Sequence, residues 1–370
     1  MKLLLAASLY PPEARGPSTF AGQLVEHLTT QGIAVEVVKF RDVRKLPFGI
    51  RHVVYFCKLL SHGRGATIVL ALDPISTGLP ALWASRLLGA KFVLRVGGDY
   101  AWEQGAQRFG IADTLDIFVA REKSSYPFSI RLLWRVQAYV ACHAAAIVVP
   151  SRYLKGIVER WGVPPGRIEV LYSAIAHASG LSHEEARNKL KMGDEPVVFS
   201  LGALVPWKGF PVLIDAIAQV RRRFPNVKFI VAGEGPLKSK LIQQALHAGL
   251  GEVFLGDIPN AQVLEHLRAA DVFALNTGYE GLSHVLIEAM MSAVPMVTTP
   301  VGGNPELIED GSTGRLVPVN NKEAFVAVIE ELLADKESAR LLGEKARTRA
   351  NELFSAEKSM RGWEKLLHTV

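Results

Sequence analysis

Residues 276–288 read Asn276-Thr-Gly-Tyr-Glu-Gly-Leu-Ser-His-Val-Leu-Ile-Glu288, and the second half of the chain is organised around them. The apolar run before them, 272–275, predicts a buried strand. Ser283 precedes a run with helical spacing and is therefore the predicted N-cap of a helix. A second apolar run, 295–299, leads into a paired-glycine turn at 302–303. This order predicts a strand, loop, helix and strand of a parallel sheet.

Two carboxylates flank the predicted start of this helix. Glu280 lies in the loop before it, and Glu288 lies more than one turn inside it. Backbone N–H groups and the helix dipole favour an anion at such a helix start. The arrangement suits a ligand with an anionic middle and hydroxyl-rich ends, and a nucleotide sugar has this chemistry.

Length and composition describe a globular protein of about two domains. The chain has 370 residues, which is too long for one ordinary core. Of these residues, 49% are hydrophobic and 21% are charged, as in globular proteins. Cys57 and Cys142 are expected to be reduced thiols buried in helices of a cytosolic protein. Residues 10–12, Tyr-Pro-Pro, interrupt the first apolar run, so this run predicts a buried strand rather than a signal peptide. No apolar stretch reaches the roughly 18–20 residues of a transmembrane helix.

Charge is distributed unevenly along the chain. Residues 1–175 hold 21 Lys and Arg against 12 Asp and Glu, whereas residues 176–370 hold 21 against 24. A basic half suggests an anionic partner, such as nucleic acid or a membrane surface. Segment Lys39–Arg64 interleaves basic with aromatic and aliphatic residues, a pattern that can lie on an anionic membrane. A helix packed on a sheet with a charged outer face fits it equally well.

Apolar runs alternate with helical patterns throughout, which predicts parallel sheets covered on both faces. Strands are expected at 3–7, 34–40, 68–72, 92–96, 146–149 and 168–171, and again at 197–201, 229–232, 253–255, 272–275, 296–299 and 316–319. We expect an N-terminal domain over residues 1–175 and a C-terminal domain over 176–354. The stretch from 321 to the end is expected to be helical except near 354–355. Ligands of such sheets bind beyond the carboxyl ends of the strands, so a cleft between the two domains is the expected site.

Five loops that follow predicted strands contain residues able to contact such a ligand. Gly16 lies in a loop with hydroxyl side chains, where backbone amides could approach a phosphate. Asp99 follows paired glycines, and its carboxylate could accept a sugar hydroxyl or cap a helix. Lys208 lies between Gly202 and Gly209 and could meet phosphate oxygens as a point charge. Two further loops, Gly233-Glu234 and Asp257-Ile258, could line a nucleoside pocket.

Several motifs are missing from the sequence. It has no Asp-x-Asp pair for a divalent metal and no zinc spacing, so no metal is expected. There is no Gly-x-Gly-x-x-Gly after the first strand, which argues against hydride transfer. There is also no Gly-x-Ser-x-Gly elbow, which argues against an α/β-hydrolase.

Together these loops resemble the retaining GT-B glycosyltransferases of glycosyltransferase family 4. Glu280 and Glu288 match the family's Glu-x7-Glu signature, and Gly-Gly-Asn-Pro-Glu follows at 302–306. The stretches 202–209, 231–235 and 311–314 are also similar to family motifs, as are Tyr-Pro-Pro at 10–12 and Pro-Ser-Arg at 150–152. The resemblance covers nearly the whole chain, and it implies two Rossmann-like domains that face an interdomain cleft.

The resemblance also implies a role for each matching residue. Lys208 would bind the donor diphosphate, Glu288 the ribose hydroxyls and Glu280 the transferred sugar. The amides of Gly281, Leu282 and Ser283 would face phosphate and sugar. Gly16 would let the first-domain loop close over the donor. The last helix, about 355–370, would return to the first domain, and no cofactor or metal is implied.

Three positions depart from the family pattern. Ala203 stands where an arginine often accompanies the donor lysine. Gly97-Gly98-Asp99 replaces the usual first-domain histidine, so Asp99 is the catalytic candidate there beside Lys208 and Glu280. The linker 173–176 reads Ser-Ala-Ile-Ala instead of Asn-Gly-Ile-Asp.

The predicted activity is transfer of a sugar from a nucleotide-diphosphate sugar to a saccharide or lipid-linked acceptor, with retention. Cell-envelope polysaccharide or glycolipid synthesis is the expected context, and nucleic acid is not an expected partner. We expect a cytoplasmic protein, with a peripheral position on the inner face of the cytoplasmic membrane if segment 39–64 binds lipid. A nucleotide-sugar epimerase of GT-B fold and a non-catalytic nucleotide-sugar-binding protein are the alternatives.

Overall fold

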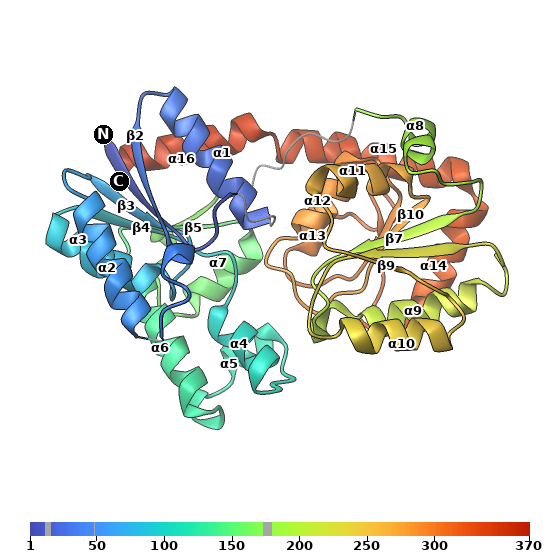
Figure 1. Cartoon of the computed structure of the whole chain (residues 1–370), viewed down its shortest axis with the longest axis horizontal. Helices are drawn as coiled ribbons and strands as arrows, with labels where there is room; N and C mark the ends of the chain where they lie inside the picture. The colour runs from blue at the N-terminus through green and yellow to red at the C-terminus, as the bar shows by residue number, and fades with distance from the viewer. Residues whose placement is uncertain (12–15, 48, 173–179) are drawn as a thin grey trace. The chain divides into compact units, whose positions relative to one another are not determined.

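The computed structural model describes residues 1–11, 16–47, 49–172 and 180–370. Contacts between Cα atoms divide the chain into two units. Unit 1 comprises Met1–Ala174 and Ala356–Val370, and unit 2 comprises Ile175–Ser355. Each unit contains a six-stranded parallel sheet flanked by helices (Figure 1). The predicted α/β fold with two doubly wound halves is therefore confirmed.

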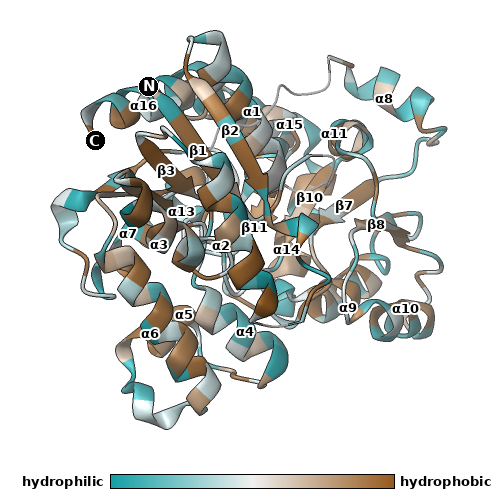
Figure 2. Cartoon of the chain, turned by 60° about the vertical axis from the view of Figure 1, so that its left-hand side comes forward, coloured by the Kyte–Doolittle hydropathy of each residue, from teal (hydrophilic) through white to brown (hydrophobic). Residues whose placement is uncertain are grey.

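The sheet of unit 1 has the strand order β2-β1-β3-β4-β5-β6. The four inner strands are almost fully buried, as expected where helices cover both faces, whereas the edge strands β2 and β6 are only partly buried. Figure 2 shows hydrophobic residues concentrated on β1, β2 and β3. The six strands are β1 (Lys2–Ala7), β2 (Ala34–Lys39), β3 (Ile68–Ala71), β4 (Lys91–Arg95), β5 (Ala146–Val149) and β6 (Ile168–Val170). The helices are α1 (Gly16–Thr30), α2 (Ile50–His62), α3 (Gly78–Leu88), α4 (Tyr100–Arg108), α5 (Leu115–Ala120), α6 (Phe128–Cys142), α7 (Arg152–Glu159) and α16 (Ala356–Thr369).

The last helix, α16, packs inside unit 1 although it is distant in sequence. Trp363 is 1% exposed, and its ring centroid lies 5.6 Å from that of Phe20 on α1. The Ser359 hydroxyl donates to the Tyr172 carbonyl oxygen at 2.7 Å. Figure 1 shows α16 running beside α1. Burial of a tryptophan and the surrounding leucines anchors this end of the chain by the hydrophobic effect.

The sheet of unit 2 has the order β12-β11-β10-β7-β8-β9, so β7 lies between β8 and the later strand β10. The strands are β7 (Val197–Leu201), β8 (Lys228–Ala232), β9 (Phe254–Gly256), β10 (Val272–Leu275), β11 (Met296–Thr298) and β12 (Arg315–Leu316). The helices are α8 (His183–Lys189), α9 (Phe210–Val220), α10 (Lys238–His247), α11 (Asn260–Ala269), α12 (His284–Met291), α13 (Asn304–Leu307), α14 (Lys322–Ala334) and α15 (Lys336–Leu353). All twelve predicted strands are present; the bounds of β5, β7 and β10 match the prediction, and the ends of the other strands differ by one to three residues. Short 3-10 turns lie at Phe40–Asp42, Lys123–Ser125, Pro165–Arg167 and Pro206–Lys208.

Two expectations about local structure were wrong. Cys57 is exposed, because α2 turns Tyr55 and Leu59 into the core and leaves Cys57 on its outer face. The C-terminal stretch is broken at Asp335 as well as near 354–355, since the Asp335 side chain accepts from the Ser338 N–H and caps α15. Among the described residues, none of the helices combines the length and apolar character needed to cross a membrane.

Candidate active site

The candidate site is built on the carboxyl ends of neighbouring strands in unit 2. The loop after β7 approaches the loop after β10, where the Gly278 N–H donates to the Trp207 carbonyl oxygen at 2.6 Å. Gly209 has φ +53, and a Cβ there would lie 2.3 Å from the amide nitrogen of Asn276. Glycine is therefore required for these loops to approach so closely.

This approach brings Lys208 onto Glu280, 72 residues later in the chain. Lys208 Nζ forms an ion pair with Glu280 Oε1, and the two side chains are only 13% and 11% exposed. Low exposure reduces solvent screening of the pair. The structure thus holds a cation and a carboxylate together at the edge where ligands of such sheets bind.

The loop after β11 packs against the backbone of Glu280. A Cβ at Gly302, which has φ +57, would lie 1.8 Å from the Glu280 carbonyl oxygen. The Gly303 N–H donates to the same oxygen at 3.0 Å. The loop that follows β8 packs on the β7 loop in the same way, because a Cβ at Gly233 would lie 2.0 Å from the Gly202 carbonyl oxygen. Four strand-end loops therefore pack closely against one another at this edge of the sheet.

Ser283 caps α12, as the sequence predicted. Its side chain accepts from the Leu286 N–H at 3.4 Å, and the residue is 2% exposed. Gly281 and Leu282 immediately before it are buried. The first turn of this helix thus lies beside the Lys208–Glu280 pair, where its N–H groups and dipole favour an anion.

Glu288 lies further along α12 and is half-buried. Its carboxylate accepts from the Asn260 side-chain amide at 3.0 Å, at the start of α11. Burial raises the pKa of Glu288 to about 7, and the hydrogen bond from Asn260 opposes this only in part. A carboxyl group that is half-ionised near neutral pH can accept ligand hydroxyls once a ligand stabilises its charged form.

The other predicted donor-side residues of unit 2 lie at neighbouring strand ends. Glu234 follows β8 and pairs with Lys238 at 2.5 Å. Asp257 is exposed and Ile258 half-buried, directly after β9. Gly16 is the first residue of α1 in unit 1, and the adjoining loop positions 12–15 lie outside the described residues, as does the linker 173–179.

Sequence reasoning did not assign roles to three asparagines that organise this edge. Asn260 positions Glu288, as described above. Asn276 is fully buried; its amide donates to the Gly209 carbonyl oxygen at 3.1 Å and to Asn320 Oδ1 at 2.9 Å. An asparagine directly after an apolar strand was the available signal. Its partners could not be read from sequence, because they lie in distant loops.

Asp99 is fully buried in unit 1 and caps α4. One carboxylate oxygen accepts from the Trp102 N–H at 2.9 Å and the other from the Trp161 indole N–H at 3.2 Å. Burial raises the pKa of Asp99, against hydrogen bonds from Trp102, Gln137 and Trp161 that lower it. These contacts give Asp99 a structural task, and its predicted catalytic role stays a prediction.

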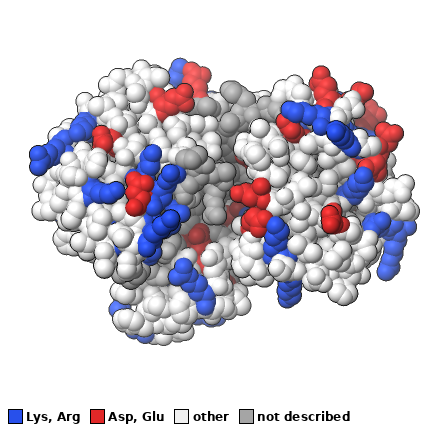
Figure 3. All heavy atoms as spheres, viewed as in Figure 1, with Lys and Arg blue, Asp and Glu red and all other residues white. Residues whose placement is uncertain are grey.

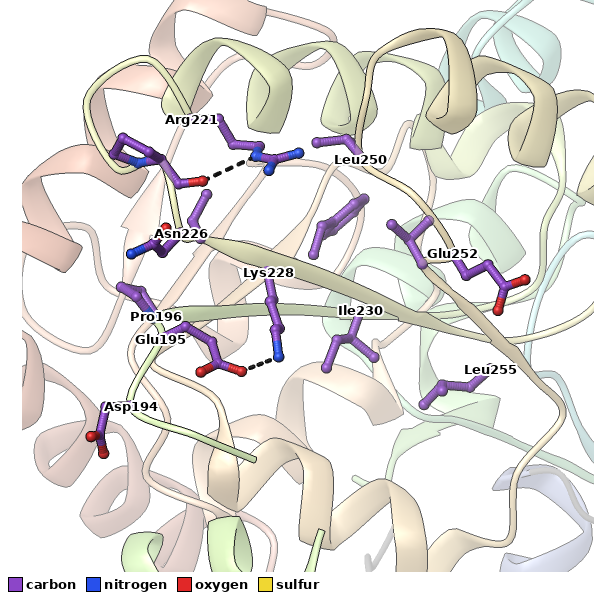
Figure 4. Close-up of a pocket in the computed structure, with 14 residues that line it drawn as sticks. Asp194, Glu195, Pro196, Arg221, Asn226, Lys228, Ile230, Leu250, Glu252 and Leu255 are labelled. Carbon is purple, nitrogen blue, oxygen red and sulfur yellow. Dashed lines mark hydrogen bonds and ion pairs between the residues drawn. The ribbon is translucent and has the colours of Figure 1, made fainter. Parts of the chain in front are cut away.

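A large depression in unit 2 lies on the wrong edge of the sheet for this site. It measures about 960 Å³ and is lined by residues near the amino ends of β7 and β8, among them Pro196 and Lys228. Figure 4 shows Lys228 directed at Glu195. Arg221 donates to the Pro225 carbonyl oxygen, so both basic side chains of this depression are engaged locally. Parallel sheets bind ligands at the opposite, carboxyl edge.

Charges on the visible face are mixed in both units (Figure 3). Among the described residues, no group of three or more His, Cys, Asp or Glu side chains is placed to hold a metal ion.

Two family models match the chain side by side. The model for "Glycosyl transferases group 1" matches residues 182–349, and that for "Glycosyl transferase 4-like domain" matches residues 5–174. Together with the two six-stranded sheets, these matches define a glycosyltransferase of the GT-B fold. The chain belongs to glycosyltransferase family 4.

Curated relatives and a solved structure agree with this assignment. A GDP-mannose-dependent alpha-(1-6)-phosphatidylinositol monomannoside mannosyltransferase of Mycolicibacterium smegmatis is 36% identical over 213 residues, which cover 54% of this chain and 56% of the relative. The lipopolysaccharide core biosynthesis glycosyltransferase LpsE of Rhizobium meliloti is 31% identical over 188 residues, covering 50% and 54%. The chain thus spans about half the length of the curated relatives it matches. HepE of Anabaena, solved with UDP and glucose, is 20% identical with a TM-score of 0.77 over the full length of both chains and shares the fold.

Proposed function

We propose that this protein transfers a sugar from a nucleotide-diphosphate sugar to an acceptor hydroxyl, with retention of the anomeric configuration and without a metal ion. The observation that carries the proposal is the low-exposure Lys208–Glu280 pair beside the capped start of α12, with Glu288 one turn further along. HepE was solved with UDP and glucose, and this supports a nucleotide sugar as donor.

The chemistry assigns each of these residues a different task. The bond between the anomeric carbon and the diphosphate oxygen breaks, and the acceptor oxygen bonds to the same face of that carbon. The acceptor proton passes to the departing phosphate oxygen. Negative charge grows on the diphosphate, where Lys208 and the N–H groups of the α12 start stabilise it by preorganised electrostatics. Glu280 contacts the sugar, where positive charge grows, and Glu288 accepts the ribose hydroxyls.

The ion pair implies that ligand binding rearranges Lys208. Glu280 neutralises the lysine, so an incoming diphosphate competes with this carboxylate for the same cation. Once the ligand shares Lys208, Glu280 is free to turn toward the sugar. The pair keeps both groups in place before the substrate arrives.

For the acceptor side, we infer a lipid-linked saccharide reached from an anionic membrane surface. An apolar groove of about 420 Å³ lies between α2 and α3, lined by Val53, Phe56 and Trp83 among others. Val53 is 62%, Trp83 46% and Leu87 70% exposed, and Arg86 stacks 5.0 Å from the Trp83 ring centroid. Exposed apolar side chains with basic neighbours favour an anionic bilayer. The phosphatidylinositol mannoside named for the M. smegmatis relative supports such an acceptor.

Calorimetric titration with UDP-, GDP- and ADP-sugars, followed by a transfer assay in EDTA, tests the donor proposal. We expect one nucleotide sugar to bind, and its sugar to appear on a lipid acceptor with the anomeric coupling constant of the donor. Conversion of the donor into an epimeric nucleotide sugar would instead identify an epimerase. Binding without any turnover would identify a non-catalytic binder.

Sedimentation with vesicles tests the membrane proposal separately. The wild-type chain should pellet with vesicles that contain phosphatidylglycerol but remain in solution with phosphatidylcholine alone. Trp83→Ser should reduce the pelleted fraction. Leu341→Ser removes a comparably exposed side chain, 46%, from unit 2 and should leave the pelleted fraction unchanged. Equal behaviour of the two variants contradicts the assignment of the groove.

A further inference from the structure

We propose that a second pocket in unit 2 binds the phosphate group of a small phosphorylated molecule. It lies between α8, α11, α14, α15 and the C-terminal end of α12, and its volume is about 400 Å³. Basic side chains from two elements reach it: Arg268 from α11, and Lys336, Arg340 and Arg347 from α15. This site is additional to the donor site proposed above and does not depend on it.

The acidic residues of the pocket are already neutralised. Asp271 pairs with Arg187 at 3.2 Å, and Glu344 pairs with Arg340 at 2.6 Å. Among the described residues, the side chains of Lys336 and Arg347 form no hydrogen bond or ion pair. Two cations that line this pocket, Lys336 and Arg347, are therefore outside any ion pair of the described part of the chain.

Arg268 is held in place but keeps free hydrogen-bond donors. Its Nε donates to the Leu181 carbonyl oxygen at 2.9 Å, and its Nη1 donates to the Ser292 carbonyl oxygen at 3.0 Å. These bonds fix the plane of the guanidinium and leave three of its five N–H donors for a ligand. Burial and the nearby Arg347 lower the pKa of Arg268, and the Glu344 carboxylate opposes this shift only in part. An anion bound between the two guanidiniums would relieve their repulsion.

Ser292 adds a second, independent indication. It caps the end of α12 and lines the pocket at 2% exposure, and its hydroxyl has no hydrogen-bond partner in the described part of the chain. A buried hydroxyl without a partner costs free energy. An oxyanion in the pocket would supply an acceptor for it.

The dimensions favour a phosphate attached to a small organic group. A volume of about 400 Å³ exceeds that of a bare phosphate and suits a small metabolite. Apolar residues, including Val294 and Leu332, line the remaining wall and would pack against the organic part. The pocket lies at the C-terminal end of α12, whereas the candidate active site lies at its start. The two sites are therefore distinct.

Isothermal titration calorimetry of the full chain with glucose 6-phosphate, inorganic phosphate and glucose tests the proposal. The Lys208→Ala background removes the cation that would bind phosphate at the donor side. We expect glucose 6-phosphate to bind this background, inorganic phosphate to bind more weakly and glucose not to bind. Arg347→Glu should weaken binding by at least about tenfold, the usual effect of losing one charge-assisted contact.

Lys345→Glu is the matched control. Lys345 is exposed on the same helix, does not line the pocket, and its replacement makes an identical change in net charge. We expect Lys345→Glu to leave the affinity for glucose 6-phosphate within about twofold of that of the Lys208→Ala background. The proposal is overturned if neither phosphate compound gives saturable heat, if glucose binds as well as glucose 6-phosphate, or if Lys345→Glu weakens binding as much as Arg347→Glu. Circular dichroism verifies that each variant is folded.

Discussion

Replacing Lys208 with alanine removes the cation that we assign to the departing diphosphate. Unit charges about 4 Å apart interact by about 4 kcal/mol at an effective dielectric constant of about 20, which suits a pair near the surface. The Lys208 side chain is 13% exposed, so this effective dielectric constant applies to its interactions. Only the charge that develops in the transition state lowers the barrier, so we expect a loss of about 3 kcal/mol, or about 100-fold in the rate of the transfer step.

Single-turnover transfer from the identified nucleotide sugar is the assay, because it separates chemistry from product release. Lys208→Arg keeps the charge and should restore part of the rate. Lys189→Ala is the matched control, since Lys189 also pairs with a glutamate of unit 2, Glu265, at 2.7 Å but lies on α8, away from the strand-end loops. Full turnover by Lys208→Ala, or an equal loss in Lys189→Ala, would refute the electrostatic assignment.

Three further predictions concern Glu288, the glycine contact behind Glu280 and the last helix. If the donor binds only ionised Glu288, whose pKa is about 7, the affinity of the protein for the donor should rise about tenfold from pH 6 to pH 8. Calorimetry measures this affinity, and Glu288→Gln should show no such rise. Gly302→Ala should lower the free energy of unfolding in urea by about 2–4 kcal/mol, because its Cβ would clash with the Glu280 carbonyl oxygen and its φ is positive. Gly311→Ala is the control: Gly311 has φ +72 but no neighbour within 4 Å, so only about 1 kcal/mol should be lost. Equal losses in the two variants would exclude the clash. Trp363→Ala should destabilise unit 1 by about 3–5 kcal/mol, and an unchanged thermal midpoint would contradict its packing against Phe20.

Much of the fold was predictable because its signals are local. Buried parallel strands appear as short apolar runs, and this is why all twelve were found within three residues of their ends. Ser283 was recognisable as a cap, since a cap depends only on its own turn of helix. The boundary near Asp335 was missed because α14 and α15 follow each other with a single capping residue and no glycine or proline between them.

The sequence by itself determined the strand-and-helix pattern and the kinds of residue at each strand end, since these follow from periodicity and from the immediate neighbours of each residue. It named Lys208, Glu280 and Glu288 as candidates. Only the tertiary structure decided that Lys208 pairs with Glu280, that burial raises the pKa of Glu288, and that Asp99 is enclosed under α4. These properties depend on which distant loops become adjacent. The insertion of β7 between β8 and β10 sets that adjacency, and no local pattern encodes it.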